Sequence, residues 1–185
     1  MNITSTDLPG VFLLEPDVFN DSRGFFLESY NQRTFSEAGL NYNFVQDNHS
    51  LSLDAGVIRG MHYQLTPKAQ TKLLHVLTGA IIDVVVDIRN NSPTFARWIM
   101  VTLSATNKKQ LLVPKGFAHG FCTLEPHTEV LYKVDEYYSP EHDRGILWKD
   151  PNLGIPWPTE HPILSDKDLR HPVLKLAELD PYKFN

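Results

Sequence analysis

An arginine, a glycine and a histidine lie within one apolar segment, Val57-Ile58-Arg59-Gly60-Met61-His62-Tyr63-Gln64. Arg59 can hold a phosphate or carboxylate through two parallel hydrogen bonds. Gly60 lets the backbone bend or approach a ligand closely, and His62 can take or give a proton near neutral pH. The segment therefore suits an anionic ligand. Each residue also has a plainer reading, because a lone histidine in a strand is more often a hydrogen-bonded core or rim residue.

A second informative stretch is Leu112-Val113-Pro114-Lys115-Gly116-Phe117-Ala118-His119-Gly120-Phe121. Its proline and glycine predict a turn that delivers His119 at a strand start. The stretch matches the second motif of cupin jelly rolls, whose metal-binding members add two histidines, one residue apart, and a glutamate. The first motif here reads His62-Tyr63-Gln64, with Lys72 nearby in the sequence. One histidine is missing and a cation would repel a metal, so we expect no bound metal.

The composition is that of an ordinary globular protein. The chain has 185 residues, of which 42% are hydrophobic and 21% charged, and this length suffices to bury a full core in one domain, predicted over residues 1–185. The net charge of −5 disfavours general nucleic-acid binding. An anionic ligand must therefore meet a local group of basic residues.

The apolar runs are too short to span a bilayer, and the first residues lack a basic region followed by an apolar core. We therefore expect no membrane partner and a cytoplasmic location. The one cysteine, Cys122, excludes an intrachain disulfide. Its apolar neighbours favour a buried structural thiol.

Short apolar runs separated by turn residues recur along most of the chain. The predicted strands are Val11–Glu15, Phe25–Tyr30, Phe44–Asn48, Ile58–Tyr63, Leu73–Leu77, Ile81–Ile88, Trp98–Leu103, Leu111–Val113, Phe117–Leu124 and Val130–Val134. This spacing indicates an antiparallel sandwich or barrel. A helical turn is predicted over Thr34–Ala38 and a short helix over Val173–Leu179.

Strand alternation raises two questions about side-chain direction. In Ile81–Ile88 it places Asp83 and Asp87 on one face, which is either the wall of a polar pocket or a solvated surface. Arg59 and His62 have opposite parity, so a regular strand would send them to opposite faces. We predict a bulge or bend at Gly60 that lets both reach one cavity.

Several motifs, in the same order along the chain, resemble those of the dTDP-4-dehydrorhamnose 3,5-epimerase family, the nucleotide-sugar epimerases of the L-rhamnose pathway. The matching stretches are 21–28, 46–50, 59–64, Lys72 with 83–89, 113–121, 131–133 and 137–140. The resemblance covers nearly the whole chain. It implies a mainly all-β, cupin-like jelly-roll barrel or sandwich with a few short peripheral helices. It also implies a homodimer that acts on a dTDP-linked 4-keto-6-deoxy sugar without metal or organic cofactor.

The resemblance further implies catalytic roles. Inversion of a carbon next to a ketone requires a base, support for the enolate oxygen, and an acid on the opposite face. By resemblance His62 is the base, and Asp168 holds its other ring nitrogen. Lys72 would stabilise the enolate and Tyr132 would be the acid. The plainer reading of Tyr132 is packing inside the barrel.

Binding roles are implied in the same way. The resemblance places Arg23, Arg59 and His119 around the pyrophosphate and Tyr138 against thymine. Polar contacts to the base and sugar are expected from Glu28, Gln46, Asp47 and Asn48. Asp143, which stands where a glutamate is expected, and Lys167 also align with binding positions. The N-terminal segment 10–28, which carries some of these residues, is expected to cross to the partner subunit.

Three alternatives stay open at this point. A one-centre epimerase, acting at C3 or C5 of a related dTDP-4-keto-6-deoxysugar, would keep similar motifs, so His62 and Tyr132 do not decide between one inversion and two. A metal-dependent cupin would contain metal and lose activity with a chelator. A non-enzymatic sugar-binding cupin would have no need of the complete set of four catalytic residues.

Overall fold

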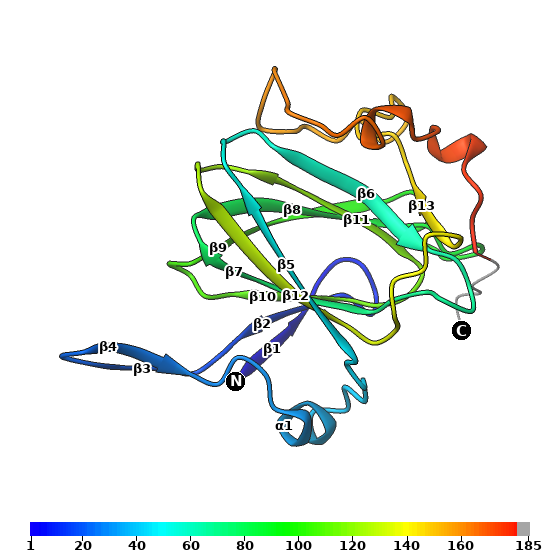
Figure 1. Ribbon diagram of the computed structural model, residues 1–185. Coiled ribbons are helices and arrows are strands. Elements are labelled where there is room, and N and C mark those ends of the chain that lie inside the picture. The colour runs from blue at the N-terminus through cyan, green and yellow to red at the C-terminus, as the bar shows by residue number, and fades with distance from the viewer. Residues whose placement is uncertain (181–185) are drawn as a thin grey trace.

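The computed structural model, which describes residues 1–180, contains two antiparallel sheets packed face to face (Figure 1). The first sheet contains, in spatial order, β1 (Asn2–Ser5), β2 (Phe12–Glu15), β10 (Gln110–Val113), β7 (Lys72–Thr78), β12 (Thr128–Val134) and β5 (Gln46–Ser52). The second contains β13 (Asp143–Gly145), β6 (Ile58–Gln64), β11 (Phe117–Thr123), β8 (Ala80–Asp87) and β9 (Trp98–Ser104). We call them the six-stranded and the five-stranded sheet.

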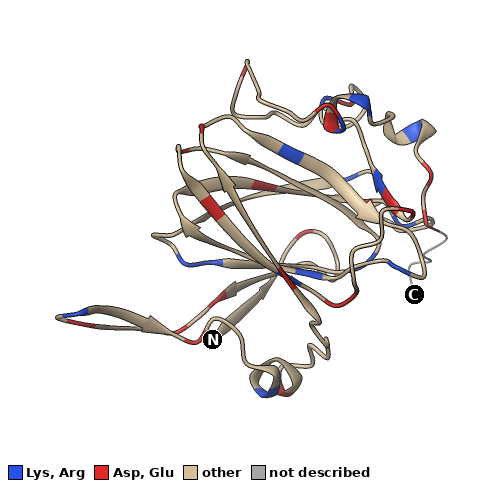
Figure 2. Cartoon of the chain, in the orientation of Figure 1, with Lys and Arg blue, Asp and Glu red and all other residues tan. Residues whose placement is uncertain are grey.

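The remaining elements lie outside the two sheets. Strands β3 (Val18–Asp21) and β4 (Gly24–Leu27) form a separate hairpin that projects from the body (Figure 1). The helix α1 (Gln32–Glu37) and the single 3₁₀ turns η1 (Asp168–Arg170) and η2 (Leu174–Leu176) complete the described chain. The chain after β13, residues 146–180, is called the tail. Figure 2 shows basic and acidic residues interspersed over the sheets, the hairpin and the tail. Within residues 1–180, no helix has the length and hydrophobicity needed to cross a membrane.

Alternation along the strands produces three apolar layers. The residues between the sheets include Leu74, Val76 and Val130 from the six-stranded sheet and Ile81, Val85 and Phe121 from the five-stranded sheet. The tail covers the outer face of the five-stranded sheet, where Met61, Tyr63, Val84 and Val86 meet Ile146, Leu153, Ile155 and Leu174. Phe35 of α1 packs with Leu73 and Leu112 on the outer face of the six-stranded sheet. Because residues on both faces are buried, the strands read as nearly continuous apolar runs.

The predicted strands are all present, with their ends shifted by a few residues. Three strands were missed: β1, β3 and β13 are only three or four residues long and carry mostly polar or exposed residues. The predicted helix over 173–179 is wrong except for the turn η2, because Val173 and Ala177 on either side have extended backbones. The single domain predicted over 1–185 stays a prediction, and its last five residues lie outside the described part.

The direction of the β8 side chains is settled by the fold. Asp83 and Asp87 are completely buried, so the solvated-face reading is wrong for both. Asp83 faces the space between the sheets, whereas Asp87 accepts hydrogen bonds from Arg89, Ser92 and Thr94 at the strand end. Cys122 is buried as predicted, and burial raises the pKa of its thiol to about 11.

Candidate active site

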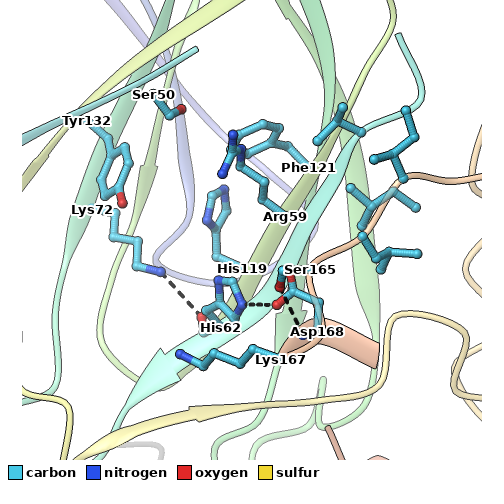
Figure 3. Close-up of a pocket in the computed structure, with 14 residues that line it drawn as sticks. Ser50, Arg59, His62, Lys72, His119, Phe121, Tyr132, Ser165, Lys167 and Asp168 are labelled. Carbon is cyan, nitrogen blue, oxygen red and sulfur yellow. Dashed lines mark hydrogen bonds and ion pairs between the residues drawn. The ribbon is translucent and has the colours of Figure 1, made fainter. Parts of the chain in front are cut away.

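A cavity of about 420 Å³ opens between the two sheets, and Figure 3 shows the side chains that surround it. Most of its polar lining comes from four strands: β6 and β11 of the five-stranded sheet, and β7 and β12 of the six-stranded sheet. The lining residues are Ser50, Val57, Ile58, Arg59, His62, Lys72, His119, Phe121, Tyr132, Ile163, Leu164, Ser165, Lys167 and Asp168. All four residues with an implied catalytic role therefore share one cavity.

His62 and Asp168 form a close pair at this cavity. His62 Nε2 lies 2.5 Å from Asp168 Oδ1 (Figure 3), and the Asp168 backbone N–H donates to Ser165 Oγ. Burial raises the pKa of the Asp168 carboxyl, but the neighbouring His171 and His62 rings outweigh it and hold that pKa well below its usual range. An ionised carboxylate can only accept, so the shared proton sits on Nε2 and leaves Nδ1 as the basic nitrogen.

The environment keeps the His62 imidazole ready to accept a proton. Burial lowers the pKa of His62, the hydrogen bond and charge of Asp168 oppose that effect, and Lys72 adds to it. The His62 side chain is still 32% exposed. A neutral, accessible imidazole held by a carboxylate is the arrangement expected of a general base.

Lys72 enters the cavity from β7 of the facing sheet. It is 9% exposed, and its Nζ donates to the His62 carbonyl oxygen over 3.3 Å. Burial lowers the pKa of the Lys72 ammonium to about 8, while Asp143 and Asp83 oppose the shift. A buried ammonium with so few partners can stabilise a negative charge that develops beside it.

Tyr132 stands on β12, the strand next to Lys72, and packs at the edge of the interior cluster. Burial raises the pKa of its phenol, so the group is a neutral proton donor at physiological pH. The Tyr132 side chain therefore packs in the interior, as the plainer reading expected, and also lines the cavity. Tyr132 and His62 come from opposite sheets, so they reach the cavity from opposite walls (Figure 3).

The predicted irregularity at Gly60 is confirmed. In the pairing of β6 with β11, His62 faces His119 and Arg59 faces Phe121, so β6 contains one extra residue between these positions. Gly60 has φ +138°, and a Cβ built there would lie 2.5 Å from Gly120 Cα. The bulge turns Arg59 and His62 into the same cavity.

His119 and Asp83 form a second histidine–aspartate pair within the five-stranded sheet. His119 Nε2 lies 3.0 and 2.9 Å from the two Asp83 carboxylate oxygens. Both residues are buried, and they come from adjacent strands, β11 and β8. The pair places an imidazole beside Arg59, whose guanidinium donates to Ser52 Oγ and the Leu51 carbonyl. Arg59 thus offers hydrogen-bond donors to an anion, and His119 can add a donor through Nδ1 only when its ring carries both protons.

A smaller cavity of about 210 Å³ shares His62, Lys72, Tyr132 and Lys167 with the first and extends to Tyr138 and Asp143. The Tyr138 hydroxyl donates to Asp143 Oδ2 over 3.0 Å, and the Lys167 ammonium is ion-paired with the same carboxylate. Burial raises the pKa of the Tyr138 phenol, and the Asp143 hydrogen bond adds to this. Although a glutamate was expected at position 143, the shorter aspartate side chain still reaches both Tyr138 and Lys167.

Not all the predicted binding residues meet at the cavity. Gln46 and Asn48 share a face of β5 with Ser50, and Gln46 accepts from the Tyr138 backbone N–H. Asp47 points to the other face, where it pairs with Lys133. Its contact with the ligand stays a prediction, and alternation turns its side chain away from the face that Gln46 and Asn48 share.

Arg23 and Glu28 also lie away from the cavity. Arg23 stands at the tip of the β3–β4 hairpin, where it pairs with Asp21, and Glu28 follows β4. Neither lines the cavities around His62. Their role in ligand binding stays a prediction, because the hairpin projects from the body instead of folding over the site of its own chain (Figure 1).

One group of residues near the site carries donor atoms of the kind that bind metals. His62, Asp168 and His171 bring one such atom each within 4.8 Å of the others. The 2.5 Å separation of His62 Nε2 and Asp168 Oδ1 is shorter than the roughly 3.3 Å that two ligands of a tetrahedral ion require. We therefore describe the group as a hydrogen-bonded His62–Asp168 pair with His171 beside it.

The sequence reasoning missed several residues of the site. Phe121, Ile163 and Leu164 form apolar walls, and Ser50 and Ser165 add hydroxyls. Ser50 could have been found, since it shares the parity of Gln46 and Asn48 along one strand. The contribution of 163–165 depends on how the tail folds back, for which the sequence carries no local signal.

Comparison with known proteins provides independent information. Residues 5–176 match the family described as dTDP-4-dehydrorhamnose 3,5-epimerase. A protein of that name from Shigella flexneri is 54% identical over 170 residues, covering 91% of this chain and 93% of that protein.

Two solved structures extend this likeness to the fold. A crystal structure of the enzyme of that name from Bacillus anthracis, with TDP and pyrophosphate bound, is 59% identical, with a TM-score of 0.91 over 93% of this chain and 98% of that one. A Legionella pneumophila dTDP-6-deoxy-D-glucose-3,5-epimerase in complex with dTDP-4-keto-L-rhamnose is 44% identical, with a TM-score of 0.94 over 99% of both chains. The fold is thus a cupin-like jelly roll.

Proposed function

Since the chain belongs to the dTDP-4-dehydrorhamnose 3,5-epimerase family, we propose that it inverts C3 and C5 of dTDP-4-dehydro-6-deoxy-D-glucose. The product is dTDP-4-dehydro-L-rhamnose, an intermediate in L-rhamnose biosynthesis. The enzyme is an isomerase, and its substrate is a dTDP-linked sugar. The bound ligands of the Bacillus and Legionella relatives, TDP with pyrophosphate and dTDP-4-keto-L-rhamnose, support this substrate class.

One observation carries the proposal most directly. A carboxylate-held imidazole, His62, and a phenol, Tyr132, enter one cavity from opposite sheets, with the Lys72 ammonium in the same space. Inversion next to a ketone requires proton removal on one face and proton delivery on the other. Facing walls supply this geometry, which a protein that only binds a sugar would not need.

In the proposed step, one proton leaves the inverted carbon and another is added on its opposite face. His62 Nδ1 takes the proton from the carbon next to the ketone, and the C–H electron pair forms the enolate double bond. The charge on the ketone oxygen is stabilised by the Lys72 ammonium, and Asp168 stabilises the imidazolium. The Tyr132 hydroxyl then gives its proton to the opposite face of that carbon. Proton exchange with water restores both side chains.

Binding of the nucleotide portion is proposed for the residues that flank this centre. Arg59 and a doubly protonated His119, paired with Asp83 through Nε2, would hold the pyrophosphate through charge-assisted hydrogen bonds. Tyr138 would stack on thymine, since its ring is 55% exposed beside the smaller cavity. Gln46 and Asn48 are proposed to contact the base and sugar, while Asp143 and Lys167 order the Tyr138 ring.

We also propose that the protein is a homodimer in which the β3–β4 hairpin contacts the partner subunit. Phe19, Phe25 and Phe26 on the hairpin are 64%, 57% and 70% exposed. Monomeric proteins rarely expose several large apolar side chains together. Docking on a partner would cover these rings and carry Arg23 and Glu28 toward the partner's site. Light scattering at micromolar concentration tests this, and a fully active monomer would refute it.

Product analysis tests the proposed reaction. The protein is incubated with dTDP-4-keto-6-deoxyglucose in deuterated water, and the sugar is followed by NMR. We expect deuterium at C3 and C5 and inversion of both centres. Inversion at one carbon alone would establish the one-centre alternative, and a sugar without exchange or inversion would overturn an epimerase function.

A further inference from the structure

A second imidazole lies against the carboxylate that holds His62. His171 Nε2 is 3.6 Å from Asp168 Oδ1, the same oxygen that His62 contacts. The His62 and His171 rings are 5.5 Å apart between centroids and meet edge to face, at 74°. The His171 side chain is only 10% exposed, and its Nε2 has no hydrogen-bond partner among the described residues.

The His171 ring is closely packed against the backbone of β13. Gly145 of β13 pairs with His62 in register, and a Cβ at Gly145 would lie 2.4 Å from His171 Nε2. The next residue, Pro172, accepts a hydrogen bond from the Leu147 backbone N–H, which fastens this segment to the chain beyond β13. A buried ring nitrogen without a partner destabilises the folded protein. An apolar ring would fill the same space without that cost, so the nitrogen requires an explanation.

We propose that His171 is a positioning residue of the active site, whose Nε2–H donates to Asp168 Oδ1 beside His62 and holds the carboxylate in place during proton transfer. This inference rests on the proposed function of His62 as the base. The 3.6 Å separation exceeds a normal hydrogen bond by about 0.6 Å, so the proposed bond requires the two side chains to approach by that amount. A carboxylate oxygen can accept from two donors at once.

A second donor has a definite electrostatic consequence. It draws charge from the carboxylate, so Asp168 stays ionised and stabilises the His62 imidazolium less strongly. The other charged groups that act on the His62 imidazole are Lys72 and Asp143. Since these remain when His171 is replaced, the change in His62 reports on His171 itself. Removal of the His171 N–H should raise the pH at which His62 titrates.

The experiment compares His171→Phe, which keeps a ring but removes the donor, with His171→Gln, which keeps an N–H of similar reach. Leu169→Ala is the control. Leu169 lies two residues before His171, in η1, and its side chain is 54% exposed, so its loss should disturb the site little. For each variant we measure kcat, KM and the acid limb of kcat/KM against pH. The melting temperature shows that each variant is folded.

We expect His171→Phe to lower kcat roughly 10-fold to 100-fold, as for other outer hydrogen-bond partners of functional histidines. KM should stay nearly constant and the acid limb should move to higher pH. His171→Gln should recover most of both properties. A folded His171→Phe with unchanged kcat and acid limb would overturn the inference, as would equal losses in both variants without a pH shift.

A measurement without substrate separates this inference from the proposed reaction. In the unchanged protein, ¹⁵N NMR of the histidine rings shows which nitrogen of His171 carries the proton and where His62 titrates. The inference requires a proton on His171 Nε2, and a bare Nε2 would overturn it even if every variant misfolded. Failure of the unchanged protein to exchange or invert substrate would instead overturn the proposed function.

Discussion

Two histidines on neighbouring strands of one sheet are each paired with an aspartate, and the two pairs differ in the origin of the aspartate and in exposure. His62 and His119 are directly paired across β6 and β11. His119 is held by Asp83 of the adjacent strand, and both are buried. His62 is held by Asp168, 106 residues away in the tail, and remains 32% exposed. The same pair of side chains is thus enclosed within a sheet in one case and open to the cavity in the other.

The difference lies in which element supplies the carboxylate. Asp83 is fixed by the strand ladder, so the position of His119 is part of the sheet itself. Asp168 is delivered by the tail, which leaves the open side of His62 facing the cavity. The predictions below test whether the two pairs divide binding and proton transfer in this way.

The largest effect should separate the two histidines. We predict that His62→Asn abolishes deuterium incorporation and inversion, because loss of a general base costs roughly 10²-fold to 10⁴-fold or more. His119→Asn should mainly raise KM, since it removes the positive charge that a protonated His119 would offer to the pyrophosphate. NMR of the sugar in deuterated water measures both. Native exchange in His62→Asn would show that His62 is not the base.

The next effect concerns the wall opposite His62. Tyr132→Phe should reduce inversion by about 10²-fold or more, because the acid is lost, yet it should spare part of the deuterium exchange. A protonated His62 can return a solvent-derived deuteron to the face it came from. The same NMR experiment records exchange and inversion separately. Equal loss of the two would contradict a role for Tyr132 on the second face alone.

The aspartates of the two pairs, Asp168 and Asp83, allow a matched comparison by the same substitution. Asp168→Asn should lower kcat by about 10-fold to 100-fold, since an amide holds the wrong tautomer and no longer stabilises the imidazolium. Asp83→Asn should leave kcat nearly unchanged and lower the free energy of unfolding by about 1–3 kcal/mol through a weakened buried hydrogen bond. Steady-state kinetics and urea unfolding measure the two. The reverse pattern would exchange the functions assigned to the pairs.

Gly60 links the pairs, since its bulge turns Arg59 and His62 inward together. Gly60→Val should weaken binding of dTDP by about tenfold, because a Cβ there meets the backbone of Gly120 at 2.5 Å and the residue has φ +138°. Gly39→Val is the control for backbone strain, with φ +80° and open space around it. Calorimetric titration measures affinity. Equal effects of both substitutions would remove the bulge from the explanation.

The smallest effect is the pH dependence near the optimum. Burial lowers the pKa of His62 below its usual value, and the base must be neutral, so activity is lost as the pH falls through that pKa. Burial lowers the pKa of Lys72 to about 8, and its ammonium must be charged, so activity declines about twofold as the pH rises to 8. A kcat/KM profile measures both limbs. In Lys72→Arg, which stays charged, the alkaline decline should disappear.

The sequence by itself determined most of the β architecture and much of the site. Strands such as β8 and β11 combine β-branched and aromatic residues with short turns, and these local preferences define strands wherever both faces are buried. The opposite parity of Arg59 and His62 was enough to predict the bulge at Gly60, because strand geometry allows no other common direction. The family motifs supplied the four residues that are proposed to be catalytic.

Only the tertiary structure decided which distant residues meet. The approach of Asp168 and His171 to His62 depends on the tail folding over β6 and β13, and no local pattern encodes that path. The outward direction of Asp47 and the distance of Arg23 from the cavity likewise follow from sheet register and the projecting hairpin. Periodicity determines the face of a strand that a side chain occupies, whereas packing between elements determines what stands opposite it.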